Sequence, residues 1–200
     1  MCAKLAVAIA LGVLFVSIPS LAQVQPEAKM PHLNLNLNVG AGMDYLSGDW
    51  GAGDVNRWGP TAWATLPIWH GLGINAESQS MITGGNREAS NYKLFVGEGG
   101  VIYTSDYWGR LQPFFKGELG FASLSQPGNG TGHFHSTYST MAVGGGLEYH
   151  TWGHWWTRVD YTYYAIPNFH SGITNQNRTL DPRGLAFGET FRFGPSGSHF

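Results

Sequence analysis

Charged side chains recur at every second position in several segments of this sequence, where they could form ion pairs with one another. Lys116 and Glu118 lie in "FFKGELGF", and Arg158 and Asp160 lie in "WTRVDYTYY". Successive side chains of a β-strand point to opposite faces, so the members of each pair would share a face. An isolated buried ion is very costly, so charges inside a protein must be paired. We therefore expect a network of paired charges in the interior. Its expected members are Asp44, Glu77, Lys116, Glu118, Glu148, Arg158, Asp160 and Arg192.

A second kind of chemistry would need His135, Ser136 and Glu148, which are the residue types of a hydrolytic triad. Such a site requires hydrogen bonds between its members. His135 and Ser136 are adjacent, so in a strand their side chains would point to opposite faces. His133 and His135 could share a metal ion, but a metal site needs three or four convergent ligands. We therefore expect no catalytic residue, no cofactor and no metal site.

The charged residues lie in segments of about ten residues that alternate apolar and polar side chains, which is the pattern of half-buried strands. Eight such strands are expected, at about 33–45, 61–69, 72–82, 92–104, 111–124, 138–150, 155–166 and 183–193. The connections between them alternate between long and short. This alternation is expected of an antiparallel barrel that carries longer loops at one rim and short turns at the other.

The N-terminus has the pattern of a secretory signal peptide. Lys4 precedes an apolar run from Leu5 to Ile18, and small residues follow up to Ala22. We predict cleavage after Ala22, which would remove the only cysteine, Cys2. The expected organisation is a signal peptide at 1–22, a short leader at 23–32, a β-barrel at 33–193 and a C-terminal tail at 194–200.

The composition is typical of a β protein that borders an apolar medium. Charged residues make up 12% of the chain, against about a quarter in ordinary soluble domains. The net charge is −2, and no basic cluster suggests nucleic-acid binding. We predict an all-β fold, an eight-stranded antiparallel up-and-down transmembrane β-barrel with its apolar face toward lipid. Such a barrel has room inside only for side chains, so the charged network would plug it. The alternative is a soluble barrel with its apolar face inward.

Aromatic residues gather near the predicted strand ends, where they would form girdles at the two water–lipid interfaces. The group at the short turns is Trp69, Trp108, Trp152, Trp155 and Trp156. The group toward the long loops is Tyr45, Trp63, Tyr92, Phe121 and Tyr138. Glu189 is an exception to the charge pattern, because its parity places it on the outer, apolar face.

The last predicted strand ends in "AFGETFRF". This stretch resembles the C-terminal signal that outer-membrane barrels present to the barrel assembly machinery, a glycine followed by aromatic residues at alternate positions. The matching residues are Gly188, Phe191 and Phe193. Two features depart from that signal, because Ala186 stands where a polar residue is usual and seven residues follow Phe193.

Over residues 33–193 the sequence resembles the small eight-stranded outer-membrane barrels, namely the transmembrane domain of OmpA and the opacity-type porin-like families. Strand patterns such as "GLEY" and "FRF" carry this resemblance together with the strand architecture. The resemblance implies an exported, non-catalytic protein of the bacterial outer membrane with a structural or surface-interaction role. It leaves open a narrow pore for small solutes and an enzyme that modifies lipid A. The implied partners are outer-membrane lipid, the assembly machinery and a surface ligand of the long loops, and a monomer is expected.

Overall fold

The computed structural model describes residues 36–49, 54–83, 93–106, 108–127, 133–170 and 177–194. The chain divides into two units, Met1–Leu33 and Asn34–Phe200, and all described residues belong to the second unit. The predicted signal peptide, the leader and nearly all of the predicted tail therefore lie outside the described residues. The described part contains no helix that is long and apolar enough to span a membrane.

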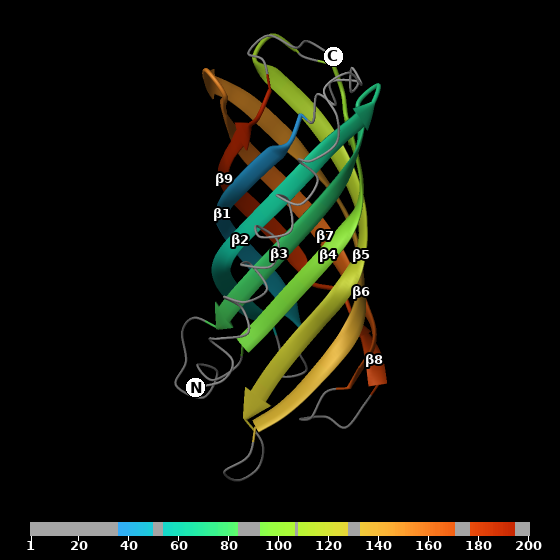
Figure 1. Ribbon diagram of the computed structural model, residues 1–200. Coiled ribbons are helices and arrows are strands. Elements are labelled where there is room, and N and C mark those ends of the chain that lie inside the picture. The colour runs from blue at the N-terminus through green and yellow to red at the C-terminus, as the bar shows by residue number, and fades with distance from the viewer. Residues whose placement is uncertain are drawn as a thin grey trace, which may run out of the picture. The chain divides into compact units, whose positions relative to one another are not determined.

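Antiparallel strands form a sheet that closes on itself as a barrel (Figure 1). The strands in the described part are β1 (Asn38–Asp49), β2 (Asp54–Trp69), β3 (Leu72–Thr83), β4 (Lys93–Thr104), β5 (Leu111–Pro127), β6 (His133–Trp152), β7 (Trp155–His170), β8 (Asn177–Leu180) and β9 (Arg183–Arg192). Closure follows because β9 pairs with β1 on one side and with β7 on the other, while β7 also pairs with β6. The short strand β8 pairs with the far end of β7 and is not part of the closed wall. The wall therefore consists of the eight predicted strands, β1 to β7 and β9.

Tight connections join strand pairs at one end of the barrel, which is the upper end in Figure 1. His70 and Gly71 join β2 to β3 with φ values of 43° and 81°, and two successive positive φ values are typical of a type I′ hairpin turn. Gly109 and Gly153 also have positive φ in the β4–β5 and β6–β7 turns. We call this the short-turn end, and the opposite end, where β8 lies, the long-loop end.

Several strands extend further toward the long-loop end than the sequence indicates. The affected strands are β1, β2, β5, β6 and β7, which were expected at 33–45, 61–69, 111–124, 138–150 and 155–166. β1 also begins at Asn38, later than expected, since the described residues 36–37 are not part of a strand. Gly59 and Pro60 are turn-forming types and favoured a loop, yet both pair with β1 inside the sheet. β8 also lies in a segment that was expected to be loop. Pairing with neighbouring strands thus overrides the local preference of these residues.

Apolar and polar side chains alternate between the two faces of the wall, as predicted. On β5, Phe115 and Leu119 are exposed on the outer face, whereas Lys116 and Glu118 are buried inside. Exposed tryptophans surround the short-turn end, namely Trp69, Trp108, Trp152 and Trp155. The soluble alternative would have buried the apolar face, so the arrangement is that of a membrane barrel.

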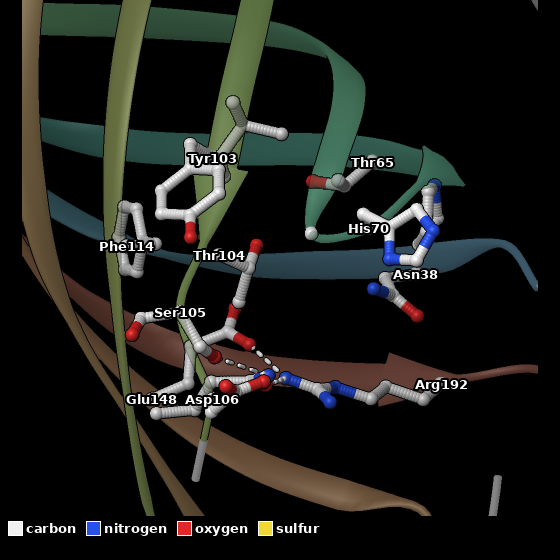
Figure 2. A pocket seen from close by; sticks show the side chains of 14 residues that line it. Asn38, Thr65, His70, Tyr103, Thr104, Ser105, Asp106, Phe114, Glu148 and Arg192 are labelled. Carbon is white, nitrogen blue, oxygen red and sulfur yellow. Dashed lines mark hydrogen bonds and ion pairs between the residues drawn. The ribbon is translucent and has the colours of Figure 1, made fainter. Parts of the chain in front are cut away.

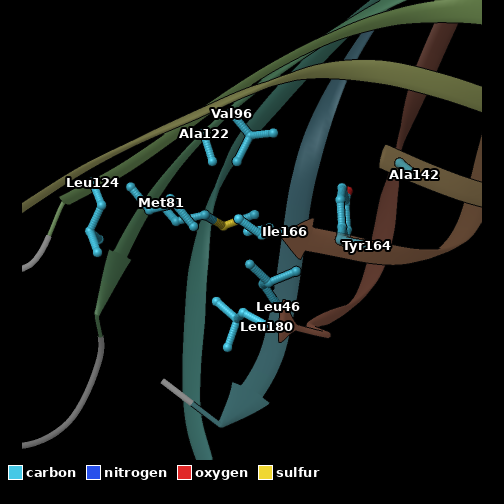
Figure 3. Packing of buried hydrophobic residues seen from close by; sticks show 10 residues of the cluster. Leu46, Met81, Val96, Ala122, Leu124, Ala142, Tyr164, Ile166 and Leu180 are labelled. Carbon is cyan, nitrogen blue, oxygen red and sulfur yellow. The ribbon is translucent and has the colours of Figure 1, made fainter. Parts of the chain in front are cut away.

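The interior is not polar along its whole length, which corrects the expectation that a polar, charged network alone fills the barrel. At the long-loop end it is filled mainly by apolar side chains, which we call the apolar plug (Figure 3), and Arg57 of β2 is buried at the same level as the register partner of Leu46. The members of the plug are Leu46, Met81, Leu94, Val96, Ala122, Leu124, Ala142, Tyr164, Ile166 and Leu180. Ser123 and Ser125 flank Leu124 on the outer face of β5, and exposed Lys93 precedes Leu94 on β4. Along these strands the polar face therefore changes from the inside to the outside.

Candidate functional site

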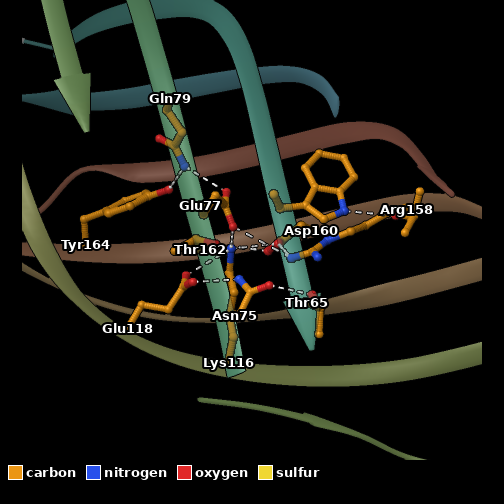
Figure 4. Close-up of polar contacts among 12 residues, drawn as sticks. Thr65, Asn75, Glu77, Gln79, Lys116, Glu118, Arg158, Asp160, Thr162 and Tyr164 are labelled. Atoms are coloured by element: carbon orange, nitrogen blue, oxygen red, sulfur yellow. Dashed lines mark hydrogen bonds and ion pairs between the residues drawn. The ribbon is translucent and has the colours of Figure 1, made fainter. Parts of the chain in front are cut away.

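Lys116 of β5 lies at the centre of the barrel interior, where its ammonium group contacts three carboxylates (Figure 4). Its Nζ atom lies 2.6 Å from Glu77 Oε2, 2.8 Å from Asp160 Oδ2 and 3.4 Å from Glu118 Oε2. The carboxylates come from β3, β7 and β5, so the contacts connect separate parts of the wall. Lys116 is only 2% exposed, and its charge is therefore balanced by these carboxylates and not by bulk water.

Arg158 of β7 is the second cation at this level. Its Nη2 atom lies 2.6 Å from Asp160 Oδ2 and 3.8 Å from Glu77 Oε2. Its guanidinium carbon lies 4.3 Å from the centroid of the Phe114 ring and 4.8 Å from that of Trp63, which are cation–π distances. Two aromatic rings thus hold the guanidinium group in the lumen. We call the following residues the central ion cluster: Glu77, Lys116, Glu118, Arg158 and Asp160.

Neutral polar side chains orient the carboxylates of the central ion cluster. Asn75 donates a hydrogen bond to Glu118 Oε1 at 2.7 Å and accepts one from the Thr65 hydroxyl at 2.6 Å. Gln79 donates to Glu77 Oε1 at 3.0 Å. These bonds compensate part of the cost of removing the carboxylates from water, and they fix the geometry of the cluster.

Trp63 lies inside the barrel beside the cluster, which corrects its predicted place in the outer aromatic girdle. It is 3% exposed, and its indole N–H donates to Thr190 Oγ1 at 3.0 Å. An added Cβ atom would lie 2.3 Å from the indole ring at Gly40 and 2.7 Å from it at Gly188. Glycines on β1 and β9 therefore provide the space that this large side chain needs.

Glu148 and Arg192 form a separate ion pair closer to the short-turn end (Figure 2). Arg192 also donates to Gln112 Oε1 at 2.6 Å. Its guanidinium carbon lies 3.7 Å from the centroid of the Trp156 ring. Trp156 is buried on the inner face, so its predicted place in the outer girdle was wrong as well. Tyr138 was also expected in the outer girdle, but it packs against the apolar plug. All three misplaced aromatic residues have the parity of the inward residues on their strands.

A cavity of about 290 Å³ lies inside the short-turn end of the barrel (Figure 2). Its lining includes His70 of the β2–β3 turn, Thr104 at the end of β4 and Arg192 of β9. Thr65 and Phe114 also line it, and both of them belong to the contacts around the central ion cluster. The cavity therefore ends at the level of the cluster.

The geometry is that of a membrane barrel with side chains filling its lumen. A family model described as "Outer membrane protein beta-barrel domain" matches residues 8–193. The chain belongs to this family. Family membership places it with the proteins of the bacterial outer membrane. A comparison with curated protein sequences gave no match.

Solved structures of outer-membrane barrels share the fold of this chain. Neisserial surface protein A (NspA) matches with a TM-score of 0.67 and 17% identity, over 78% of this chain and 97% of that chain. Ail of Yersinia pestis, in complex with the heparin analogue sucrose octasulfate, matches with a TM-score of 0.52 and 11% identity, over 80% and 100% of the two chains. OprG from Pseudomonas aeruginosa matches with a TM-score of 0.52 and 11% identity, over 80% and 96%. At these identities the likeness concerns the fold.

All eight residues of the predicted network lie on the inner side of the outer-membrane barrel, but they do not form a single network. Five make up the central ion cluster, and Glu148 and Arg192 form the separate pair. Asp44 is buried, and its Oδ1 atom has no hydrogen-bond partner among the described residues. Sequence reasoning missed two buried charged residues, Glu98 of β4, which accepts from Thr140 at 2.9 Å, and Arg57 of β2, which lies in a segment that was expected to be loop. The alternation of "KLFVGEGG" places Glu98 on the same face as Leu94 and Val96, and this pattern could have identified Glu98 as an inward residue.

The residue types of the hydrolytic triad do not come together in the barrel. Ser136 lies near the start of β6 and Glu148 near its end, where Arg192 binds the carboxylate. His135 is exposed on the opposite face of β6 from Ser136. The side chain of His133 lies outside the described residues. In the described part no group of three His, Cys, Asp or Glu side chains is placed to hold a metal ion.

The residues that match the assembly signal divide between the two faces of β9. The rings of Phe191 and Phe193 lie 4.8 Å apart, and Phe191 also packs on Trp155 with centroids 5.2 Å apart. Gly188 faces inward, where the lack of a side chain leaves room for Trp63. Gly188 thus has a packing role that is independent of any signal.

Glu189 faces outward from β9, as its parity predicts. It is exposed and accepts a hydrogen bond from Thr157 Oγ1 at 2.8 Å. The next outward-facing residue along β9 is Phe191, which is the register partner of Trp155 at the start of β7. This places it close to the short-turn interface, where an outward carboxylate costs at most about 1 kcal/mol.

Proposed function

We propose that this chain is a non-catalytic outer-membrane barrel with a closed interior, and that it has a structural or surface-interaction role. The observation that carries the proposal is the position of Lys116, whose ammonium group is held among three carboxylates at the centre of the lumen. Arg158, Trp63 and Phe114 fill the same level. A passing ion would have to displace a buried and hydrogen-bonded ion cluster, which is costly.

The apolar plug adds a second closure at the long-loop end. Leu46, Met81 and Leu124 are almost fully buried there. An ion that enters this mainly apolar layer loses its water and gains few partners in return. A solute from the short-turn cavity would meet the charged layer first and the apolar layer next. This arrangement favours a closed barrel over the narrow pore.

Planar bilayer recordings of the purified barrel test this proposal, with heat-modifiable migration on gels as the check of folding. We expect no steady channel from the wild type. The triple variant Lys116→Ala, Met81→Ala, Leu124→Ala removes side chains from both layers and should conduct. A matched outer-face variant, Phe115→Ala with Leu119→Ala, should stay silent. Steady channels from the wild type would overturn the proposal and favour the narrow pore.

The non-catalytic part of the proposal is tested by the lipid A of cells that express the barrel. The separation of Ser136 from Glu148 along β6 supports it. We expect the mass of lipid A to be the same with and without expression. A mass decrease equal to one acyl chain would instead support a lipid A-modifying enzyme.

The surface-interaction part rests on strand length. β2, β5, β6 and β7 contain 16, 17, 20 and 16 residues, whereas about 9–11 residues suffice to cross a bilayer. We infer that the wall projects beyond the membrane at the long-loop end, with the apolar plug as its core, and carries the loops toward a partner. Cells that display the barrel should attach to a surface matrix more strongly than matched cells without it. Equal attachment of the two would contradict this role.

A further inference from the structure

Glu189 is unusual among the outward side chains of the barrel. Within the described residues, it is the one acidic or basic side chain that faces outward between the exposed tryptophans of the short-turn end and the Tyr45–Trp58 pair. Lys93 and Arg183 also face outward, but they lie at the long-loop ends of their strands. Acidic side chains that face lipid are rare in membrane proteins, so this position suggests a function.

The surroundings of Glu189 orient its carboxylate without neutralising it. Thr157 of β7 donates to its Oε1 atom at 2.8 Å, and the Thr157 hydroxyl lies 3.0 Å from that of Thr151. No cationic side chain of the described residues pairs with it. On the other side its register partner is Ala41 of β1, whose small side chain leaves the carboxylate open. The group is therefore an oriented anion that lacks a counter-charge from the protein.

The level of Glu189 in the membrane indicates what could supply that charge. The next outward position toward the rim is Phe191, whose ring meets Trp155 edge-on. Aromatic residues of this kind mark the water–lipid interface, and short turns of outer-membrane barrels face the periplasm. Glu189 therefore lies within reach of the headgroups of the periplasmic phospholipid leaflet. A primary ammonium headgroup has three N–H donors and a positive charge, which match an exposed carboxylate.

We propose that Glu189, Thr157 and Ala41 form a lipid site on the outer wall that binds the ammonium headgroup of phosphatidylethanolamine. Glu189 accepts from the headgroup amine, Thr157 holds the carboxylate in place, and Ala41 provides the open side. The site uses the outer face of the barrel and is independent of whether the lumen is closed.

Native mass spectrometry of the intact barrel tests this site. The protein is equilibrated with equal amounts of phosphatidylethanolamine and phosphatidylglycerol that have the same acyl chains. We expect the wild type to retain phosphatidylethanolamine with a preference of about two- to fivefold, the size expected of one partly exposed ion pair. Glu189→Gln keeps the volume and the bond from Thr157, and it should abolish the preference. Glu189→Lys should reverse it toward phosphatidylglycerol.

Asp181→Asn is the matched control, because it removes an exposed carboxylate at the long-loop end and should leave the preference unchanged. Equal retention of phosphatidylethanolamine by the wild type and Glu189→Gln would overturn the proposal. A lower unfolding temperature of Glu189→Gln with an unchanged lipid preference would also overturn it, since that result assigns Glu189 a structural role. Cross-linking of two barrels through this face in a lipid bilayer would overturn it in favour of a protein contact.

Discussion

Trp63 occupies the space that a side chain at Gly40 would need, since an added Cβ atom there would lie 2.3 Å from the indole ring. The two residues are register partners on β2 and β1. The same indole packs on the guanidinium group of Arg158, 4.8 Å from the ring centroid. A glycine on β1 thus helps to position a cation on β7. A substitution at this glycine should therefore shift Trp63 and disturb the packing around Arg158 at the centre of the lumen.

Gly40→Ala should lower the free energy of unfolding by about 1–3 kcal/mol, because an overpacked interior must shift the indole or the backbone. Gly117→Ala is the matched control, since nothing lies within 4 Å of an added Cβ there, and its effect should stay within about 0.5 kcal/mol. Urea unfolding in lipid vesicles, followed by tryptophan fluorescence, measures both variants. Equal losses in the two variants would contradict the packing of Trp63 against Gly40.

Lys116→Met should be among the most damaging substitutions in the barrel, with a loss of about 3–5 kcal/mol in unfolding free energy. The reason is that Glu77, Glu118 and Asp160 would lose their shared cation inside the wall. Lys93→Met, at an exposed position of β4, should change stability by less than about 0.5 kcal/mol.

Adding Glu77→Gln to Lys116→Met should recover part of this loss, because a neutral amide does not need the cation. The double-mutant cycle is read from the same urea unfolding curves. Strictly additive losses would show that the two side chains are not coupled, in conflict with the 2.6 Å contact between them.

Leu124→Ala tests the apolar plug. The side chain is buried in the interior at the long-loop end, so its truncation should leave a cavity and cost about 2–5 kcal/mol. Leu119→Ala on the same strand removes an exposed side chain of the outer face, where lipid chains can fill the vacated space, and its cost should be smaller. If the order of the two losses were reversed in lipid vesicles, the plug would not be a packed core.

Phe193→Ala should slow assembly in cells and leave the folded barrel stable, because the ring is exposed at the end of β9. Gly188→Ala should do the opposite and lower stability, since an added Cβ would lie 2.3 Å from the Ala41 carbonyl oxygen of β1 and 2.7 Å from the Trp63 ring. Pulse-chase labelling with heat-modifiable gel migration measures the first effect, and urea unfolding measures the second. Normal assembly kinetics of Phe193→Ala would argue against a role of this residue in the signal.

The strand count and the assignment of faces could be predicted because a period of two is a local property of the sequence. Lys116 and Glu118 lie inside, and Phe115 lies outside, as their parity requires. The parity of Trp63 also indicated the interior, but its place near a predicted strand end led to the wrong assignment. The start of β2 could not be predicted, because Gly59 is kept in the sheet by pairing with β1.

The division of the charged residues into separate sites could not be predicted, because parity gives the face of a residue and not its partner. Glu148 is the register partner of Arg158 on the adjacent strand. Its carboxylate nevertheless contacts Arg192 of β9, while Arg158 turns toward Asp160. Side-chain direction within the lumen decides between these partners, and it depends on the packing of Trp63, Phe114 and Trp156. Similarly, the interior changes from charged to apolar residues with position along the barrel axis. That position is defined only when the pairing register of all strands is known.

Along the strands the polar side chains change from the inner face to the outer face near the long-loop end. This change also fixes the depth of the barrel in the bilayer. A displacement toward the periplasm would bring Ser123 and Ser125 into the acyl chains, and the opposite displacement would expose Phe121 to water. Both movements raise the free energy, so the barrel has little freedom to slide when the hydrocarbon thickness changes. In a thinner or thicker membrane the lipids next to the wall would have to stretch or compress to match it.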